Sequence, residues 1–401
     1  MLRAQLAQAE EISWKAWSGY LPRVFASGAL QEQSKIVADL SQIGPPPPAG
    51  SPPPAPIPVT IQAGQVAQGQ IQVSQTLLSA SLIYGIRQAN AAERSATLNI
   101  ANGRRSLLFG VAGAYYGAAT LKETVGVTER LLEIAQRQEK DARVRFQAGT
   151  IAKVGLLRAE IDRARAEQDL KRARNAYESQ RLALATLLDR DTSFDVTPPP
   201  PPPLAENATG EDLVKLALDL RLDVKAARAD IDTARAFRNG AVGRYIPNIN
   251  AFYTYSEQSA PSLFAPGSNW TLGLGLQWTI LDGGLRESDI REGNARIAAS
   301  DAALRSTEAK ARQEVLTALI DLDSARANAA KAKEQRDLAA ENSRLIDVSY
   351  KAGASTAVEL ADATASLRTA EIGVLTEDLN AQLAALRVLL AVGQFDPEAK
   401  R

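Results

Sequence analysis

Two very long stretches without proline constrain this chain more than any other feature. Residues 59–197 and 267–396 contain no proline and are rich in Ala, Leu, Glu, Arg and Gln, which are strong helix formers. Residues 285–345 alone form one uninterrupted helical pattern, which at ~1.5 Å per residue predicts a helix ~90 Å long. Ordinary globular helices end near ~20 residues, so the pattern favours a coiled-coil-like assembly of long helices.

The prolines gather instead in two clusters, at residues 43–59 and 197–204. Such runs favour extended polyproline II and predict loops or semi-rigid connectors. A ligand for SH3-type domains is an alternative interpretation. It is disfavoured because basic anchor residues do not flank the clusters.

The chain repeats one pattern twice. Gly149 and Gly353 are 204 residues apart, and an aromatic side chain stands three residues before each, Phe146 and Tyr350. Segments around the expected strands match at shifts of 203 and 225, because the first copy carries the longer, proline-rich insert. The sequence therefore predicts an internal two-fold repeat.

The first structural repeat is expected at residues 1–204 and the second at residues 205–401. In the first we expect strands at about 20–33 and 66–79, a long helix at about 82–146, a tip turn at 147–153, a helix at about 154–189 and a proline-rich linker to 204. In the second we expect a helix at about 210–243, strands at about 245–258 and 269–281, a long helix at about 285–350, a tip turn at 351–356 and a helix at about 357–392.

The composition excludes several classes of site. The chain has no cysteine and no histidine, which removes disulfides, thiolate and imidazole metal sites and the commonest general base. The 46 Lys and Arg residues balance 46 Asp and Glu residues, so no nucleic-acid partner is expected. We therefore predict no catalytic residue, no metal site and no cofactor.

An enzyme remains one alternative, because Asp282, Glu287 and Asp289 lie close together in the sequence. They follow a strand-to-helix junction, where acidic residues at a helix N-terminus are the simpler interpretation. Asp-Gly-Gly at residues 282–284 is not a phosphate loop, since no Gly-Lys-Ser/Thr follows it.

The start of the chain does not read as a signal peptide. Glu10, Glu11 and Lys15 occupy the place of an apolar core, and no run of about 18 apolar residues exists anywhere. At the shift of 225, Met1 corresponds to Ala226, so the first copy lacks a counterpart of residues 210–225. We expect that the signal peptide and the opening of the first helix are missing through truncation.

The expected strands have the pattern of membrane strands. Residues 269–281 alternate strictly between large apolar side chains and Thr, Gly or Gln. Trp270 and Trp278 are eight residues apart, roughly 26 Å, which suits the aromatic girdles of an apolar band ~25 Å tall. Tyr253 and Tyr255 occupy the apolar positions of the preceding strand. A soluble, half-buried strand is the alternative, but the other face carries the uncharged polar residues of a wet lumen.

Four strands cannot close a barrel, because about eight is the practical minimum. An open sheet in lipid would leave backbone groups unpaired at its edges, which is prohibitive. Several copies of the chain must therefore share one barrel.

Together these patterns resemble the TolC-type outer-membrane efflux protein family. The most specific parts are the duplicated aromatic-x-Ala-Gly turn, the segment "SYKAGASTAVELADAT", the "LQWTILDGG" junction and the Tyr-x-Pro strand starts. The resemblance implies a mainly α protein with a small β part, in which very long antiparallel helices form an α-barrel. It also implies a homotrimer whose protomers each contribute four strands to a shared transmembrane β-barrel.

The resemblance implies a passive exit duct for drugs, other small molecules or secreted proteins. By the same resemblance, the duct is expected to lie in the outer membrane, to contact its lipid and to extend into the periplasm. The resemblance also implies that an inner-membrane pump drives it through a periplasmic adaptor protein. The alternative is that the chain is itself a periplasmic adaptor or another non-catalytic scaffold of long helices.

The resemblance also assigns roles at the periplasmic tip. Gly149 and Gly353, with Phe146, Tyr350 and Ser355, belong to the turns where the adaptor docks. A glycine there can adopt positive φ as a helix cap and allows another backbone to approach.

Glu359 and Asp362 match positions that carry an acidic ring at the pore entrance, and their i, i+3 spacing places them on one helix face. A solvated helix face is the alternative. Ser355 and Gly155 stand where some relatives have a salt-bridged pair, so such a closed gate is not expected here.

Overall fold

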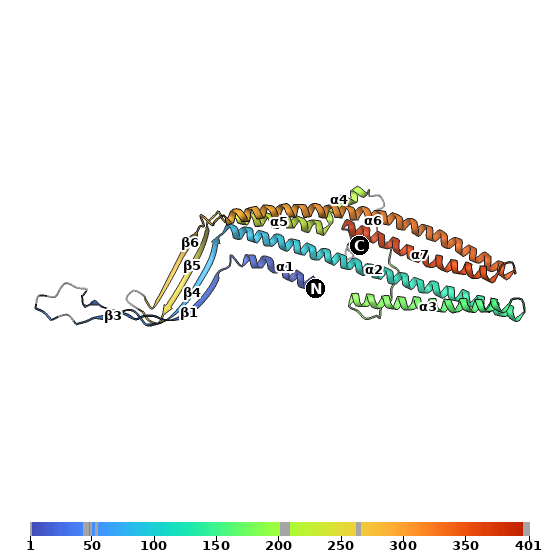
Figure 1. The fold of residues 1–401 in the computed structure, drawn as a ribbon, viewed down its shortest axis with the longest axis horizontal. Helices are drawn as coiled ribbons and strands as arrows, with labels where there is room; N and C mark the ends of the chain where they lie inside the picture. The colour runs from blue at the N-terminus through green and yellow to red at the C-terminus, as the bar shows by residue number, and fades with distance from the viewer. Residues whose placement is uncertain are drawn as a thin grey trace. The chain divides into compact units, whose positions relative to one another are not determined.

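The computed structural model describes residues 2–42, 48, 50–52, 55–200, 209–261 and 266–395. The chain divides into two compact units, one of residues 1–97 with 228–302 and one of residues 98–227 with 303–401. Each unit combines segments that are far apart in the sequence, so each contains parts of both predicted repeats. Figure 1 shows the elements along the chain.

The first unit contains a four-stranded antiparallel sheet with the strand order β1-β4-β5-β6. The strands are β1 (Arg23–Glu32), β4 (Gln65–Leu78), β5 (Asn248–Gln258) and β6 (Ser268–Gln277). They lie close to the four strands that the sequence predicts. Among the described residues, β1 and β6 each pair on one side only, so this sheet has two open edges.

The two faces of the sheet differ in chemistry, as the alternation predicts. On one face Ile71, Tyr255 and Trp270 stand opposite one another on three neighbouring strands. On the other face Gln72 pairs with Thr254 in the same way. The apolar face is uncovered in the single chain: Leu272, Leu274 and Leu276 keep 68%, 72% and 66% of their surface exposed.

A second, two-stranded ribbon extends this unit and was not predicted from the sequence. It consists of β2 (Ile36–Asp39) and β3 (Pro58–Gln62), which pair antiparallel, and a single 3₁₀ turn, Leu40–Gln42, follows β2. The Asp39 carboxylate accepts hydrogen bonds from the backbone of Ser41 and Ile57, both at 2.9 Å. Strands this short beside a proline cluster carry too little alternation to be recognised. Most of the proline run at 43–49 lies outside the described residues.

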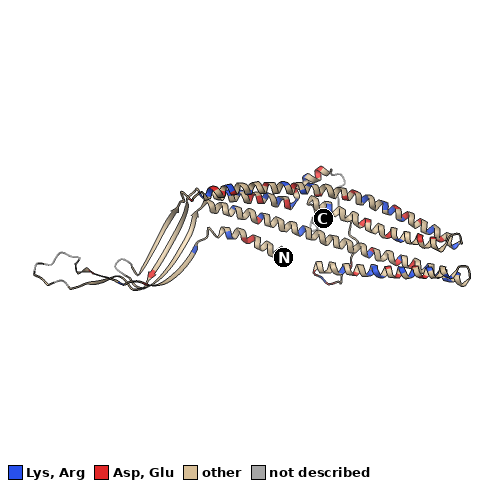
Figure 2. Ribbon diagram, viewed as in Figure 1, with Lys and Arg blue, Asp and Glu red and all other residues tan. Residues whose placement is uncertain are grey.

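The helices have the lengths that the proline-free stretches predict. The long ones are α2 (Ala80–Gln147) and α6 (Leu285–Lys351), and each is followed by a shorter one, α3 (Lys153–Leu188) or α7 (Ala357–Val392). Three further helices are α1 (Leu2–Trp17), α4 (Gly210–Leu220) and α5 (Leu222–Gly243). Figure 2 shows that the charged residues lie along the helices and are sparse on the strands.

The second unit has small, alanine-rich cores between its helices. The largest cluster joins α4, α6 and α7 through Val214, Val315 and Val392, which are 3%, 0% and 1% exposed. Alanines such as Ala217 and Ala385 fill the spaces between them. Small side chains let neighbouring helices approach closely, and this suits long helices packed side by side.

The sequence predicts one helix over residues 210–243, and the structure breaks it at Arg221. This residue has an extended backbone, with φ −63° and ψ 130°, between α4 and α5. Its guanidinium binds Asp223 at 2.7 Å and Glu314 at 2.6 Å and donates to the carbonyl oxygen of Ala391. These three partners, from different helices, fix Arg221 at the break.

The segment after α3 is held against the helices. The Asp195 carboxylate accepts hydrogen bonds from the Lys122 ammonium at 2.6 Å and from the Tyr177 hydroxyl at 3.0 Å. Val196 beside it is fully buried. Tyr116 donates to the carbonyl oxygen of Pro200, so the start of the predicted proline-rich linker is anchored. The remainder, from residue 201 to 204, lies outside the described residues.

No helix in the described part of the chain combines the length and the apolar composition needed to cross a membrane.

Candidate functional site

The two tip turns have nearly identical backbones. Gly149 and Gly353 have φ of +73° and +80°, and each is the second residue after the end of its helix, α2 or α6. In the first turn the amide of Thr150 donates to the carbonyl oxygen of Arg145, and in the second Ala354 donates to Ser349, both at 2.9 Å. This pattern is a Schellman cap, which needs positive φ at the glycine position.

Both glycines are exposed, and the space beside them is open. A Cβ atom built on Gly149 or Gly353 would meet no atom within 4 Å. Glycine is thus required here by the backbone angle and not by crowding within the chain. The uncovered backbone leaves room for another chain to approach.

The two helical hairpins, α2 with α3 and α6 with α7, are joined at the tip by Arg145, for which the sequence pattern carries no signal. Its guanidinium donates to the carbonyl oxygens of Tyr350 at 2.9 Å and Lys351 at 3.0 Å. It also lies 5.1 Å from the centre of the Tyr350 ring. These carbonyls belong to the last turn of α6, where backbone acceptors lack helical partners, so Arg145 caps that helix from outside.

Glu359 helps to cap the N-terminus of α7. The Thr356 side chain accepts from the amide of Glu359, and the Glu359 carboxylate accepts from the amide of Thr356 at 2.7 Å, which completes a capping box. The Thr-x-x-Glu spacing is a sequence signal for this role. Asp362 is exposed one turn later, and Ser355 is half-buried just before the cap. Phe146 in the first turn is 38% exposed.

The first hairpin lacks these acidic residues. Gly155 and Arg158 occupy the positions 204 residues before Glu359 and Asp362. The helix α3 begins after Ala152, which makes no side-chain cap. The acidic pair at these two positions is therefore present in the second hairpin only.

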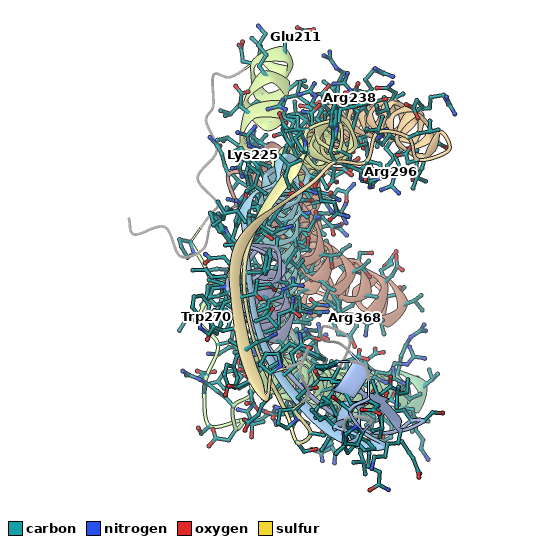
Figure 3. The ribbon with its side chains drawn as sticks, turned by 90° about the vertical axis from the view of Figure 1, so that its left-hand side faces the viewer. Glu211, Lys225, Arg238, Trp270, Arg296 and Arg368 are labelled. Atoms are coloured by element: carbon teal, nitrogen blue, oxygen red, sulfur yellow. The ribbon has the colours of Figure 1, made fainter. Side chains whose placement is uncertain are left out.

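The aromatic residues of the predicted girdles lie on or beside the sheet. Trp270, labelled in Figure 3, is 67% exposed, and Trp278 just beyond β6 is 55% exposed. Tyr253 is 37% exposed, and Tyr255 is partly buried opposite Trp270. The Trp278 indole donates to the carbonyl oxygen of Tyr245, so its polar end is satisfied while its ring stays exposed.

The acidic residues at the start of α6 pair with neighbours. Asp282 binds Arg286 at 2.9 Å, and Asp289 binds Arg244 at 2.5 Å. Glu287 accepts from the Tyr245 hydroxyl at 2.6 Å, and this bond raises the pKa of Tyr245 above its ordinary value. No group of acidic residues in the described part of the chain has the arrangement of a metal site. Each of these carboxylates thus has a partner that fixes the junction.

The model of the family described as "Outer membrane efflux protein" matches residues 3–190 and 213–394, which is almost the whole chain. The chain belongs to the outer membrane efflux protein family. It is therefore an efflux protein of the outer membrane, and the family assignment favours this over the alternative of a periplasmic adaptor.

Individual relatives agree with the family assignment. The chain is 23% identical over 350 residues to nodulation protein T of Rhizobium leguminosarum bv. trifolii, covering 80% of this chain and 72% of that protein. It is 22% identical over 344 residues to outer membrane protein TolC of Salmonella enteritidis, covering 82% and 69%. The outer membrane protein VceC of Vibrio cholerae has the same fold, with a TM-score of 0.76 at 16% identity over 98% of this chain and 92% of VceC.

Proposed function

We propose that this efflux protein is one protomer of a homotrimeric channel whose β-barrel crosses the outer membrane. The observation that carries the proposal is the sheet with one apolar face, one polar face and two open edges. Open edges in lipid would leave backbone donors and acceptors unpaired, at several kcal/mol for each group. Pairing β1 of one copy with β6 of the next removes both edges.

The exposed surface of the single chain supports an assembly. The chain exposes 25005 Å², whereas a compact monomer of 42.9 kDa exposes ~15,000 Å². Part of the excess is apolar side chains along α6, where Ile320 is 67% and Leu338 66% exposed. Neighbouring protomers would cover these residues.

The matching lengths of the hairpins support the internal repeat. Helices α2 and α3 contain 68 and 36 residues, and α6 and α7 contain 67 and 36. In a trimer the two hairpins of each protomer would take equivalent places around the α-barrel. Twelve strands from three copies would form the β-barrel.

In this channel the polar face of the sheet lines the lumen and the apolar face contacts outer-membrane lipid. Trp270, Trp278, Tyr253 and Tyr255 then contribute to the aromatic girdles. The duct is proposed to be passive, as the family resemblance implies. An inner-membrane pump drives export of small molecules, drugs or a secreted protein.

The tip turns are the proposed contact with a periplasmic adaptor protein. The backbone at Gly149 and Gly353 is not covered by other atoms of the chain. Phe146, Tyr350 and Ser355 lie beside these glycines. Glu359 and Asp362 are proposed to lie at the pore entrance. This role is compatible with the capping box, since that box uses the Glu359 carboxylate without neutralising it.

The mass of the purified protein tests the assembly. Native mass measurement in detergent should give three copies of the chain, and circular dichroism should show a mostly helical spectrum. Conductance in a planar bilayer should accompany the trimer. A stable monomer without detergent would refute the proposal.

A further inference from the structure

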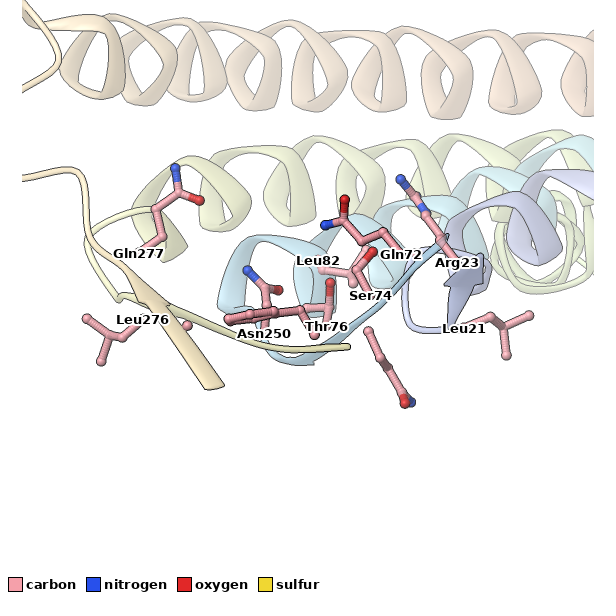
Figure 4. A pocket seen from close by; sticks show the side chains of 13 residues that line it. Leu21, Arg23, Gln72, Ser74, Thr76, Leu82, Asn250, Leu276 and Gln277 are labelled. Carbon is pink, nitrogen blue, oxygen red and sulfur yellow. The ribbon is translucent and has the colours of Figure 1, made fainter. Parts of the chain in front are cut away.

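A hollow of about 580 Å³ lies on the sheet of the first unit, at the end nearest the helices (Figure 4). Its floor comes from β4, β5 and β6, and the turn before β1 and the first turn of α2 close its side. Figure 4 shows the side chains of Arg23, Gln72 and Gln277 rising from the same side of the sheet. The hollow therefore opens on the polar face.

Arg23 is the one charged residue on the polar face of the described sheet. It stands in register with Ser74, and Ser74 in turn with Phe252. Arg23 is exposed and forms no ion pair with any described residue. The guanidinium donors of Arg23 are thus available to a molecule in the hollow.

The other walls provide both apolar contact and neutral hydrogen-bonding groups. The Phe252 ring lies over Gly273, where an added Cβ would come within 2.8 Å of the ring. Leu82 adds a second apolar wall, and Gln72 and Asn250 supply side-chain amides. An apolar wall beside one cation and several amides suits a molecule with an apolar body and an anionic end.

We propose that this hollow is a binding site for organic anions that pass through the duct. The carboxylate of such a molecule pairs with Arg23, and its apolar body lies against Phe252 and Leu82. The proposal rests on the proposed function, because it requires the polar face to line the lumen. It identifies carboxylates with an aromatic or aliphatic body as a preferred class of exported molecule.

The expected preference for anions follows from the difference in chemistry between the Arg23 guanidinium and the neutral polar groups around it. The guanidinium presents donors in a planar fork that matches both oxygens of a carboxylate, and it is more weakly hydrated than an ammonium. Amide and hydroxyl groups bind neutral and charged molecules with little discrimination between them. Arg23 therefore determines the preference for anions, and the apolar walls determine the preference for molecules with an apolar body.

Block of single-channel current tests the proposal, with benzoate as the probe in a planar bilayer. Benzyl alcohol and benzylammonium have the same ring but carry no negative charge. We expect benzoate to reduce the current at concentrations about tenfold lower than either comparison molecule. Arg23→Gln should remove this difference, and Arg23→Lys should keep part of it.

The control is Arg291→Gln, which removes the same charge from an exposed position on α6 outside the hollow. The current through this variant should be blocked by the three molecules as in the unchanged protein. Equal block by the three molecules, or unchanged benzoate block in Arg23→Gln, would overturn the inference. Because open-channel conductance is recorded in the same experiment, a channel that conducts without discrimination refutes this site alone. A protein that forms no channel refutes the proposed function.

Discussion

Arg145 and Tyr350 join the two helical hairpins at the tip. The guanidinium of Arg145 donates to the Tyr350 carbonyl oxygen at 2.9 Å and lies 5.1 Å from the centre of its ring. One side chain therefore satisfies the end of α6 and packs on its last aromatic residue. The position that corresponds to Arg145 in the second repeat is Ser349, so the second hairpin has no arginine to make the same contact with the first.

Replacing Arg145 by Ala should loosen the second tip turn. The carbonyl oxygens of Tyr350 and Lys351 would lose their charged donor, and such a hydrogen bond is worth about 1.5–3 kcal/mol. Backbone amides of residues 352–354 should then exchange hydrogen about tenfold faster or more, as measured by mass spectrometry. Arg143→Ala is the matched control, because Arg143 pairs with Glu139 and Glu160 of the first hairpin. Equal exchange in both variants would contradict the link.

The segment after α3 should lose stability in acid through Asp195. Lys122 and then Tyr177 hold the pKa of Asp195 below its ordinary value of 3.8. A carboxyl whose pKa is lowered in the folded protein stabilises it above its unfolded pKa, and this contribution is lost as the pH falls through the folded pKa. Asp195→Asn should therefore lower the melting temperature at pH 7. The difference in melting temperature between the two proteins should shrink as the pH falls below 3.8 and should vanish below the folded pKa of Asp195.

Thermal denaturation in detergent between neutral and acid pH measures this difference. Lys122→Gln removes the other partner, so it should cause a similar loss at pH 7, and adding Asp195→Asn to it should cost little more. The effect is small, since both side chains are partly exposed. A difference that persists unchanged in acid would show that Asp195 acts through packing and not through its charge.

The acidic residues of α7 should give the channel a preference for cations. Crowded carboxylates at a constriction raise the local concentration of cations. The double variant Glu359→Gln with Asp362→Asn should reduce the ratio of cation to anion permeability at least about twofold in a planar bilayer. Gln preserves the capping box at Glu359, so the helix start is kept.

Glu341→Gln is the control, because it removes a carboxylate that pairs with Arg344 on α6. It should leave the permeability ratio unchanged. If the double variant has the same ratio as the unchanged protein, Glu359 and Asp362 belong to a solvated helix face.

The sequence predicts the parts of this fold that depend on local pattern. The long helices follow from helix-forming residues without proline, and the sheet follows from period-two alternation. The contacts of Arg145 with Tyr350 and of Arg221 with Glu314 could not be predicted, because these partners lie 205 and 93 residues away and depend on how the helices pack. The ribbon of β2 and β3 was missed for a different reason, since its strands have 4 and 5 residues.

Gly149 and Gly353 have two proposed roles, one as helix caps and one as a docking surface for the adaptor. Alanine at positive φ costs about 1–2 kcal/mol at each position, which a large trimer should tolerate, and its methyl group meets no atom of this chain within 4 Å. The methyl groups would intrude only on an approaching adaptor backbone. We therefore expect Gly149→Ala with Gly353→Ala to give normal amounts of trimer in the outer membrane, weaker cross-linking to the adaptor and reduced efflux.

Valine at the same positions serves as the folding control, because a β-branched residue is disfavoured far more at positive φ, and it should reduce the amount of trimer. Normal efflux by normal trimers of the alanine variant would exclude the docking role, and loss of its trimers would leave the cap as the only role.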